Sequence, residues 1–565
     1  MKMSRKIAII IAIAVIVTLI GTVFAGCKGA VEEAVTEAIE EAVGEELEVE
    51  EEAPAEEAVE EEAPAEEAAG GVFRVYIHEP VTLDPANCYE SEGIQVIRQV
   101  FDGLVKYDPE TLETMPALAE KWDISDDGLV YTFYLKKGVN FHSGREVVAG
   151  DFVYAWTRLT LADTASYLAY HAAPIVGYDE CQEGTADTLT GVKALDDYTL
   201  EVTLQYPFAD FIKTLGHVCF FPVAKEDVDE YGDLYAENIN GNGAFKFVEW
   251  KHDQYINLVK NDDYWEENAK LDEVEYKIFA DEDTAFLEFK AGNLEYTAIP
   301  QGKVKATEED PDLGDLVIKK PLLAIYYFAM NVQNPPFKDN LALREAVNYA
   351  IDRQNICDVI NEGVSVPATG FVPPGIPGFQ ENAMEYTYDP EMAKQKLEEA
   401  GYPGGEGLEP IKFGINVGSG HEMIAEAMQA DLKDIGIDIE IIGMEWGTAL
   451  EAFQNGEISF FRLGWIADYP IMDNFLYPLF HSESSDNYSG YVNLEVDKLL
   501  VEARKTIDDD EREAKYREVE KIILDDSAFA LVYFYGIRRI VQPYVKGFFI
   551  SNMEEYDLGK VWLEK

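Results

Sequence analysis

One short segment of the chain sets two opposite charges inside an apolar run. Residues 460–469 read Phe-Phe-Arg-Leu-Gly-Trp-Ile-Ala-Asp-Tyr. Side chains of an extended strand alternate between its two faces, so four residues share one face: Arg462, Gly464, Ile466 and Asp468. Burying such charges is costly unless a partner neutralises them. A ligand with both an ammonium and a carboxylate would supply both partners, but other protein groups could do so too, and spacing alone leaves both interpretations open.

Signatures of catalysis are largely missing from the sequence. It contains no P-loop, no GxGxxG after a strand and no GxSxG elbow. His421 and Glu422 begin like the zinc-protease helix HExxH, but Ala425 stands where the second histidine would be. Acidic pairs such as Asp126-Asp127 lie in solvated, turn-like runs and carry little information in so acidic a chain. We therefore predict no catalytic residues, no metal ligands and no cofactor, and expect that the protein is not an enzyme.

Composition narrows the possible partners. The 565 residues include 108 acidic and 45 basic ones, for a formal net charge of -63. Because phosphate binding needs basic patches, we expect no nucleic-acid partner. The 32 tyrosines and seven tryptophans suit a site with rigid aromatic walls, although an ordinary core would use them too. No two cysteines form a CxxC pair, and either one disulfide or scattered buried thiols would suit Cys88, Cys181, Cys219 and Cys357.

The elements that must position these residues alternate between strands and helices. Periodicity predicts strands at residues 72–77, 130–135, 199–204, 273–279, 411–417, 437–442 and 528–535. Helical spacing predicts helices at residues 94–104, 151–161, 341–351, 393–400, 422–435, 497–503 and 512–524. The predicted class is mixed α/β, and the chain is too long for one ordinary core, which indicates more than one domain.

The N-terminus has the order of a secretory signal. Lys2, Arg5 and Lys6 precede an apolar run at 7–20, and residues 24–27 read Phe-Ala-Gly-Cys. Small residues before a lone cysteine are typical of a bacterial lipoprotein signal, in which a peptidase cuts before Cys27 and its thiol carries the lipid. An uncleaved anchor is the alternative, because the run approaches the ~20 residues that span a bilayer. Both interpretations place the body of the protein outside the cytoplasm.

Residues 28–71 follow as an acidic segment of low complexity. The sequence EEAPAEEA occurs at 51–58 and again at 61–68. Eighteen glutamates repel one another against a single lysine, and no aromatic residue is present to build a core. We expect an extended tether with transient helix, and the alternative is an acidic interaction tail.

Several motifs occur in a fixed order along the rest of the chain. They are Leu83-Asp84-Pro85, Phe101-Asp102-Gly103-Leu104, residues 116–122, 131–138 and 151–156, Asn242-Gly243-Ala244-Phe245, residues 331–353 with Pro335-Pro336-Phe337, residues 460–469, 493–500 and 544–548. Each is weak alone, but together they resemble the family 5 extracellular solute-binding proteins, the oligopeptide- and dipeptide-binding receptors of ABC importers. The resemblance extends from about residue 72 to the C-terminus.

The resemblance implies a two-lobed α/β clamshell of the periplasmic-binding-protein type (type II, cluster C) with an extra subdomain in lobe one. Lobe I would comprise residues 72–101, 227–327 and 535–565, the extra subdomain residues 102–226, and lobe II residues 328–534. Residues 1–27 would be the signal peptide and 28–71 the tether. Closure would be a hinge motion, which the ligand favours because it contacts both lobes only when they are shut.

The resemblance also implies the roles of individual residues. Asp468 corresponds to the carboxylate that receives a peptide's α-ammonium, and Arg462 to an arginine that helps receive its carboxylate. Gly464 and Ile466 fall where the receptor backbone pairs with the extended ligand. The other implied binding residues are Trp446 and Trp465 in side-chain pockets, Tyr167 and Tyr535 near the peptide, and Tyr89, Glu90 and Ser91 in a second backbone-pairing segment. Phe453 replaces a second arginine, which leaves the preferred peptide length open.

The implied function is capture of short peptides and their delivery to the permease subunits of an ABC importer. The protein would be a monomer, held to the cell membrane by lipid at Cys27, at the cell surface or in the periplasm. One alternative keeps the fold but binds an oligosaccharide, metal chelate or opine. Another, an extracytoplasmic hydrolase, lacks a nucleophile–base signature. Arg462 together with Asp468 favours a zwitterionic peptide.

Overall fold

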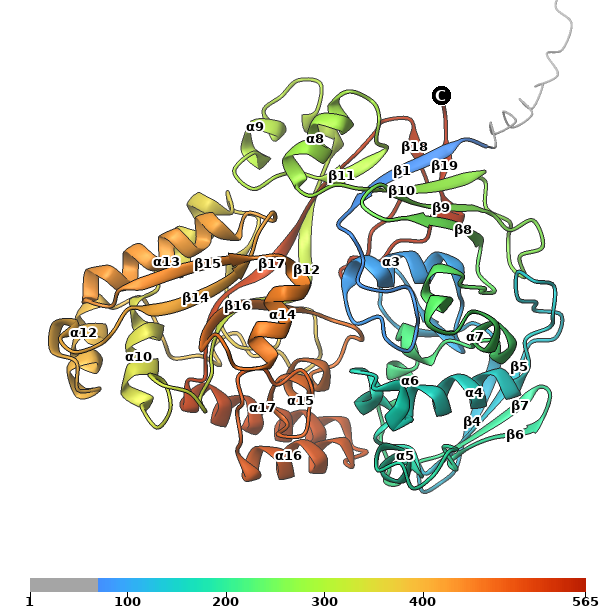
Figure 1. Cartoon of the computed structure of the whole chain (residues 1–565), viewed down its shortest axis with the longest axis horizontal. Helices are drawn as coiled ribbons and strands as arrows, with labels where there is room; N and C mark the ends of the chain where they lie inside the picture. Colours follow the sequence, from blue (N-terminus) through green and yellow to red (C-terminus); the bar gives the residue numbers. More distant parts are fainter. Residues whose placement is uncertain (1–69) are drawn as a thin grey trace, which may run out of the picture. The chain divides into compact units, whose positions relative to one another are not determined.

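The computed structural model describes residues 70–565, so the predicted signal, Cys27 and nearly all of the acidic segment lie outside the described residues. Helices and strands alternate throughout the described part, which confirms the predicted mixed α/β class (Figure 1). Across residues 70–565, no helix combines the length and the apolar character needed to span a bilayer.

An eleven-stranded sheet connects distant parts of the chain. Its strands follow the order β15-β14-β16-β12-β17-β11-β1-β10-β9-β8, with β13 paired to β17. β14 is parallel to β15 and β16, whereas β12 is antiparallel to β16 and β17. The bounds are β1 (Val72–Ile77), β8 (Phe245–Lys251), β9 (Tyr255–Lys260), β10 (Glu273–Ile278), β11 (Tyr296–Ala298), β12 (Val317–Met330), β13 (Val366–Pro367), β14 (Ile411–Asn416), β15 (Ile439–Met444), β16 (Phe460–Ile466) and β17 (Phe529–Val541).

Two long strands, β12 and β17, join the two ends of this sheet. β12 is not among the strands predicted from the sequence, and it contains Pro321, a residue type that is confined to sheet edges and bulges. The register between β12 and β17 shifts between Pro321 and Ile325, so a bulge accommodates the proline. β17 continues beyond the predicted end at residue 535, because its second half pairs with β11 and with the start of β12. The predicted lobe boundary at residue 535 therefore falls inside one continuous strand.

A second, four-stranded antiparallel sheet lies within the predicted extra subdomain. Its order is β4-β5-β7-β6, and its bounds are β4 (Ala119–Ile124), β5 (Val130–Leu135), β6 (Val192–Asp196) and β7 (Thr199–Thr203). Helix α4 (Ala149–Thr160) begins where Asp151 accepts a hydrogen bond from the Val148 backbone N–H. It buries Phe152 and Trp156 in a core shared with residues of β5 and β7.

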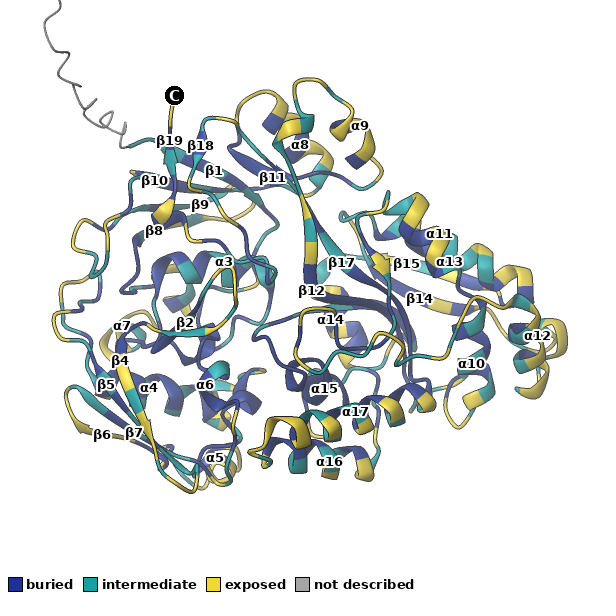
Figure 2. Ribbon diagram, turned by 180° about the vertical axis from the view of Figure 1, so that it is seen from behind, coloured by how far each residue is buried: buried dark blue, intermediate teal, exposed yellow. Residues whose placement is uncertain are grey.

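Helices cover both faces of the sheet around β14. α10 (Leu341–Ala350), α12 (Pro390–Glu399) and α13 (His421–Ile435) share one core with β14, β15 and β16. A second core contains α14 (Trp446–Gln454), α15 (Asp473–Phe480), α16 (Leu494–Arg504) and α17 (Asp509–Asp526). Figure 2 shows the buried sides of these helices turned inward and their exposed sides turned outward. The four described cysteines are free and buried, as the thiol alternative expects.

Several predicted elements are shifted by a few residues in the structure, and two of them show the local cause. The helix predicted at 94–104 is α3 (Ser91–Val100): Glu90 caps its start, and the extended backbone of Phe101 ends it. The strand predicted at 437–442 is β15, which begins two residues later. The Ile437 N–H still bonds the Leu432 carbonyl of α13, so Ile437 belongs to the helix C-cap rather than to the strand.

Candidate ligand-binding site

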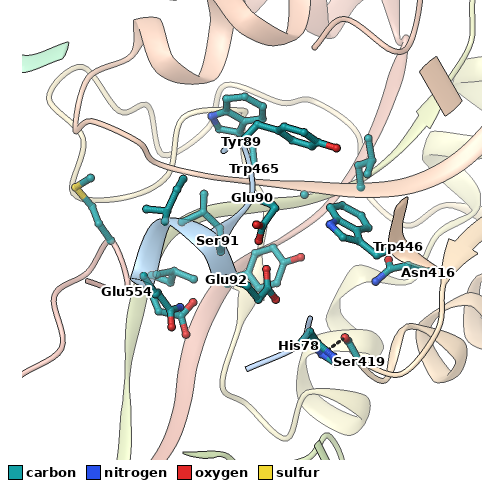
Figure 3. A pocket seen from close by; sticks show the side chains of 18 of the residues that line it. His78, Tyr89, Glu90, Ser91, Glu92, Asn416, Ser419, Trp446, Trp465 and Glu554 are labelled. Atoms are coloured by element: carbon teal, nitrogen blue, oxygen red, sulfur yellow. Dashed lines mark hydrogen bonds between the residues drawn. The ribbon is translucent and has the colours of Figure 1, made fainter. Parts of the chain in front are cut away.

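A cavity of about 810 Å³ is lined by the start of α3, by residues 462–468, by the end of β14, by the start of α14 and by residues 535–539 of β17. Figure 3 shows Tyr89, Glu90, Ser91, Trp446 and Trp465 around it. A volume of this size suits an organic ligand. Ten of the eleven predicted site residues line the cavity: Tyr89, Glu90, Ser91, Trp446, Arg462, Gly464, Trp465, Ile466, Asp468 and Tyr535. Tyr167 is not among them; it is 45% exposed and packs edge-on against Tyr89.

Strand β16 presents an open edge to the cavity. β12 pairs with β16 from Phe460 to Ile466, whereas β14 pairs only with Phe460 and Phe461. Beyond Phe461, no strand among residues 70–565 is paired to that second edge. The backbone groups of Ser459 and Ala467 bond toward β12, and successive residues of a strand alternate in direction. Gly464 and Ile466 therefore turn their N–H and C=O groups toward the open edge.

The Arg462 guanidinium forms the positive end of this segment. Its nitrogens donate to Asn416 Oδ1 at 2.8 Å and to the Tyr535 hydroxyl at 2.7 Å, and the group lies over the Tyr326 ring at 4.8 Å. Arg462 is only 7% exposed, and its Nε has no hydrogen-bond partner. Within the described residues no carboxylate forms an ion pair with it. The cation is therefore held by neutral groups only, which leaves its charge open to a ligand carboxylate.

The Asp468 carboxylate forms the negative end, and Asn474 holds it in place. Asn474 Nδ2 donates to Asp468 Oδ2 at 2.9 Å, while Asn474 Oδ1 accepts the backbone N–H of Asp468 at 2.9 Å. The same oxygen accepts the indole N–H of Trp465 at 3.1 Å. Asn474 is fully buried at the start of α15. One amide thus fixes two of the predicted ligand-binding side chains.

The charge of Asp468 has little compensation. The nearest ring nitrogen is His217 Nε2 at 3.7 Å, but burial lowers the pKa of His217 to about 3, so the ring is neutral near pH 7. Burial raises the pKa of Asp468 to about 6, and the hydrogen bond from Asn474 opposes that rise. At neutral pH the site therefore presents a desolvated carboxylate that favours a cationic group.

Two buried histidines lie beside Asp468, a grouping that the scattered sequence positions do not reveal. The His171 and His217 rings stack at 4.7 Å, and their donor atoms lie within 4.8 Å of one another and of Asp468. His217 Nδ1 accepts the Cys219 backbone N–H, so its Nε2 carries the proton. A metal ion would need that nitrogen deprotonated. The arrangement suits hydrogen bonding better than a resident metal.

The structure assigns Glu90 a local role. Its carboxylate accepts the backbone N–H of Gly93 at 3.0 Å and of Val81 at 3.2 Å, which caps α3. Ser91 is already the first residue of that helix. In the predicted segment 89–91, extended backbone able to pair with a ligand is therefore restricted to residues before Ser91.

Several cavity residues escape the sequence analysis. Asn416 could have been found, because it ends a predicted strand and side chains at the carboxyl ends of parallel strands meet at one sheet edge. His421 lines the cavity at the first turn of α13, with its Nδ1 unpartnered. Asp486, which lines the cavity, and Asn474, which does not line it but bonds Asp468, carry no local signal, because tertiary packing brings them to the site.

Strand β16 offers an open edge between two opposite charges that have no ionic partner. The cavity around this edge is built from distant segments of the chain. These features define a protein that binds a solute. The chain belongs to the family described as bacterial extracellular solute-binding proteins, family 5 Middle, whose model matches residues 113–487.

Relatives of known name cover most of the chain. It is 34% identical over 510 residues to the probable deoxycholate-binding periplasmic protein YgiS of Escherichia coli, with 86% of this chain and 92% of that protein covered. It is 33% identical over 488 residues to the periplasmic oligopeptide-binding protein OppA of the same organism, with 83% and 88% covered.

Solved structures confirm the two-lobed fold. The Escherichia coli murein tripeptide binding protein MppA superposes with a TM-score of 0.81 at 30% identity, over 88% of this chain and 99% of that one. The unliganded open form of MppA gives a TM-score of only 0.63, at 29% identity over 88% and 98% of the two chains. The present structure therefore resembles that open arrangement less than it resembles the first MppA structure.

Proposed function

We propose that this protein captures short peptides between its two lobes and delivers them to the permease subunits of an ABC importer. The observation that carries the proposal is the open edge of β16 between Arg462 and Asp468. An extended peptide that pairs with this edge gains main-chain hydrogen bonds that do not depend on its sequence.

The two charges supply complementary ends for such a ligand. Asp468 would take the α-ammonium, and Arg462 would take or approach the α-carboxylate. Six residue steps separate the two positions, which corresponds to roughly 20 Å along an extended strand. Because both side chains reach toward the ligand, peptides of a few residues fit this span. Trp446 and Trp465 provide apolar walls for side chains of varied shape.

Relatives support the class of ligand. OppA is named for oligopeptides and MppA for a murein tripeptide. YgiS, named for deoxycholate, favours a second candidate, an amphipathic acid. Its carboxylate could pair with Arg462 and its apolar body could contact Trp446 and Trp465. Such a ligand leaves Asp468 without a cation, and peptide is therefore the better match. An oligosaccharide, a metal chelate or an opine would also leave part of this pattern unused.

We propose that the protein binds its peptide ligand without hydrolysing it. One serine–histidine pair does lie in the cavity, with Ser419 Oγ 3.3 Å from His78 Nε2. That nitrogen also lies 2.8 Å from the Tyr76 hydroxyl, and His78 and Ser419 come from the segments predicted for different lobes. The pair would then be a closing contact rather than a nucleophile and its base.

The proposal extends to location and organisation. Cys27 would carry lipid at the outer face of the cell membrane, and residues 28–71 would tether a monomeric receptor near its permease. Lobe I would comprise residues 72–101, 227–327 and 535–565, with 102–226 as its extra subdomain and 328–534 as lobe II. Globomycin-sensitive processing and palmitate labelling, both lost in Cys27→Ser, would test the anchor.

Mass spectrometry of ligand released from gently purified protein tests the ligand class. We expect a mixture of short peptides, which should also raise the melting temperature when added back. Release of a bile acid or an oligosaccharide, with stabilisation by that compound and not by peptides, would contradict the proposal. Hydrolysis of the added peptides would instead support the serine–histidine pair as a catalytic one.

A further inference from the structure

The cavity contains more negative charge than a simple zwitterion would neutralise. Ten carboxylates and four arginines line it. Three of the arginines are already paired with cavity carboxylates: Arg98 with Glu555 at 2.6 Å, Arg538 with Glu282 at 2.8 Å, and Arg539 with Glu554. Arg462 is then the one lining arginine, among the described residues, that has no acidic partner.

Two carboxylates at the other end of the segment also lack a cationic partner. Asp468 is held by the neutral Asn474. Asp486 lines the same cavity, and no lysine or arginine of residues 70–565 forms an ion pair with it. Burial raises the pKa of Asp486 to about 7, the neighbouring Tyr170 hydroxyl opposes that rise, and the Asp468 charge adds to it. Asp468 and Asp486 thus line one cavity, and neither has a lysine or arginine of its own within the described residues.

A buried ring nitrogen of His171, close to Asp468, also lacks a hydrogen-bond partner. His171 is 4% exposed, and its Nε2 makes no hydrogen bond. Its ring lies against that of Tyr170, with the centroids 4.2 Å apart and the planes tilted by 30°, and a His171 ring nitrogen lies within 4.8 Å of an Asp468 oxygen. A chain of contacts thus runs from Asp486 through Tyr170 and His171 to Asp468. His171 does not line the cavity itself, so the two acids are the members of this group that a ligand can reach, and a ligand with two cationic N–H donors would satisfy both.

We infer that the preferred ligands carry a second positive charge beside the α-ammonium, as an amino-terminal lysine or arginine provides. This inference rests on the proposed peptide function. The α-ammonium would pair with Asp468, the side-chain cation of the first residue with Asp486, and the ligand carboxylate with Arg462. A peptide with a neutral first residue satisfies only two of these three charges and leaves Asp486 desolvated and unpaired.

Matched peptides test the inference. Lys-Ala-Ala and norleucine-Ala-Ala differ in little more than the side-chain ammonium, and the pair can be repeated with one and two further alanines to cover ligand length. In calorimetry, wild-type protein should bind the lysine peptide about tenfold or more tightly than its norleucine partner. Asp486→Asn should reduce this ratio to less than about threefold, because the lysine peptide loses its partner while the norleucine peptide no longer leaves a carboxylate unpaired and should bind at least as tightly as before. Asn is nearly isosteric with Asp and keeps an acceptor for Tyr170, and unchanged thermal melting checks the fold.

A second variant separates a specific partner from the general acidity of the cavity. Glu445 also lines the cavity but is solvent-exposed, so Glu445→Gln should leave the lysine preference intact. Equal wild-type affinity for both peptides would overturn the inference, and so would a preference that survives Asp486→Asn or disappears equally in Glu445→Gln. Binding of neither peptide series, in contrast, would overturn the proposed peptide function itself.

Discussion

Two buried arginines of this protein, Arg504 and Arg462, differ in what balances their charge. Arg504 is 2% exposed and donates to both oxygens of Asp473 at 2.8 and 2.7 Å, while Tyr516 donates to the same carboxylate. Arg462, at 7% exposed, has only the amide of Asn416, the hydroxyl of Tyr535 and the face of Tyr326. Both guanidiniums lie over aromatic rings, so burial and residue type do not distinguish them.

The difference separates structure from function. Arg504, whose carboxylate lies within the protein, contributes to the fold, whereas Arg462 lines the cavity without a carboxylate partner and so has charge available for a ligand. Two adjacent residues of α15 serve the two sites separately. Asp473 completes the pair with Arg504, and Asn474, the next residue, orients Asp468 toward the cavity. Variants at these positions should therefore affect either stability or binding, and rarely both.

The largest effect is expected for Arg504→Met. It leaves Asp473, which is fully buried, without its cation, and should lower the free energy of unfolding by about 3–5 kcal/mol. Chemical denaturation measures this change. Peptide affinity at a temperature where the variant remains folded should stay within about threefold of wild type, because Arg504 does not line the cavity. An unchanged free energy of unfolding in Arg504→Met would show that the ion pair of Arg504 with Asp473 does not stabilise the fold.

Arg462→Met is the matched opposite. Its neutral partners line or approach the cavity and can bond water, so unfolding free energy should change by no more than about 1 kcal/mol. Affinity for peptides should fall by about 2–4 kcal/mol, because the ligand carboxylate loses its cation. Calorimetry and denaturation of the same preparation decide between the two arginines. If Arg462→Met lost stability but kept its affinity for peptides, Arg462 would have a structural role like that of Arg504.

A smaller effect is expected for Asn474→Leu. Loss of the amide removes the hydrogen bonds to Asp468 and Trp465, and should weaken peptide binding by about 1–2 kcal/mol. The indole N–H resonance of Trp465 should shift in nuclear magnetic resonance spectra of the free variant, because its acceptor is gone. An unchanged resonance and unchanged affinity together would show that Asn474 does not position these side chains.

The smallest of these effects is expected for pH: near neutrality, the affinity for peptides should change little. The pKa of Asp468 is raised to about 6, so its carboxylate is ionised above that pH and gains a proton as pH falls through it. Affinity for a peptide ammonium should therefore be constant from pH 8 to 7 and weaken by up to about tenfold for each unit below 6. The pKa of Asp486 is also raised, to about 7, so the titration is best made in Asp486→Asn. His217, with a pKa of about 3, stays neutral throughout. A flat profile from pH 7 to 5 would contradict the role of Asp468.

Much of the fold was predictable from local pattern. The strands at 72–77 and 130–135 match β1 and β5, because alternating burial leaves a period of two in the sequence. β12 was missed because Pro321 is tolerated only through a bulge that its partner strand creates. The end of β17 was missed because the residues after Tyr535 are held in the strand by pairing with β11, not by their own apolar pattern.

The site was predictable only where it follows one strand. Arg462 to Asp468 are continuous in sequence, so their spacing could be interpreted before the fold was known. Asn474 and Asp486 approach Asp468 through packing of α15 and the loop after it, and the pairing of Arg98 with Glu555 joins residues from opposite ends of the chain. Interactions of that kind leave no periodicity. The sequence thus indicates which charges exist, but only the fold shows which of them remain uncompensated.

Calorimetry of peptide binding to wild-type protein and to Asp468→Asn tests the central claim most directly. Asn keeps the shape of the side chain and can still bond Asn474, so the fold should be retained and only the charge is lost. We predict that wild type binds tri- to pentapeptides and that the variant binds them about 2–4 kcal/mol more weakly. Acetylation of the peptide amino group should reproduce that loss in wild type and add little in the variant. Equal affinity of the two proteins for the same free peptides would contradict the account.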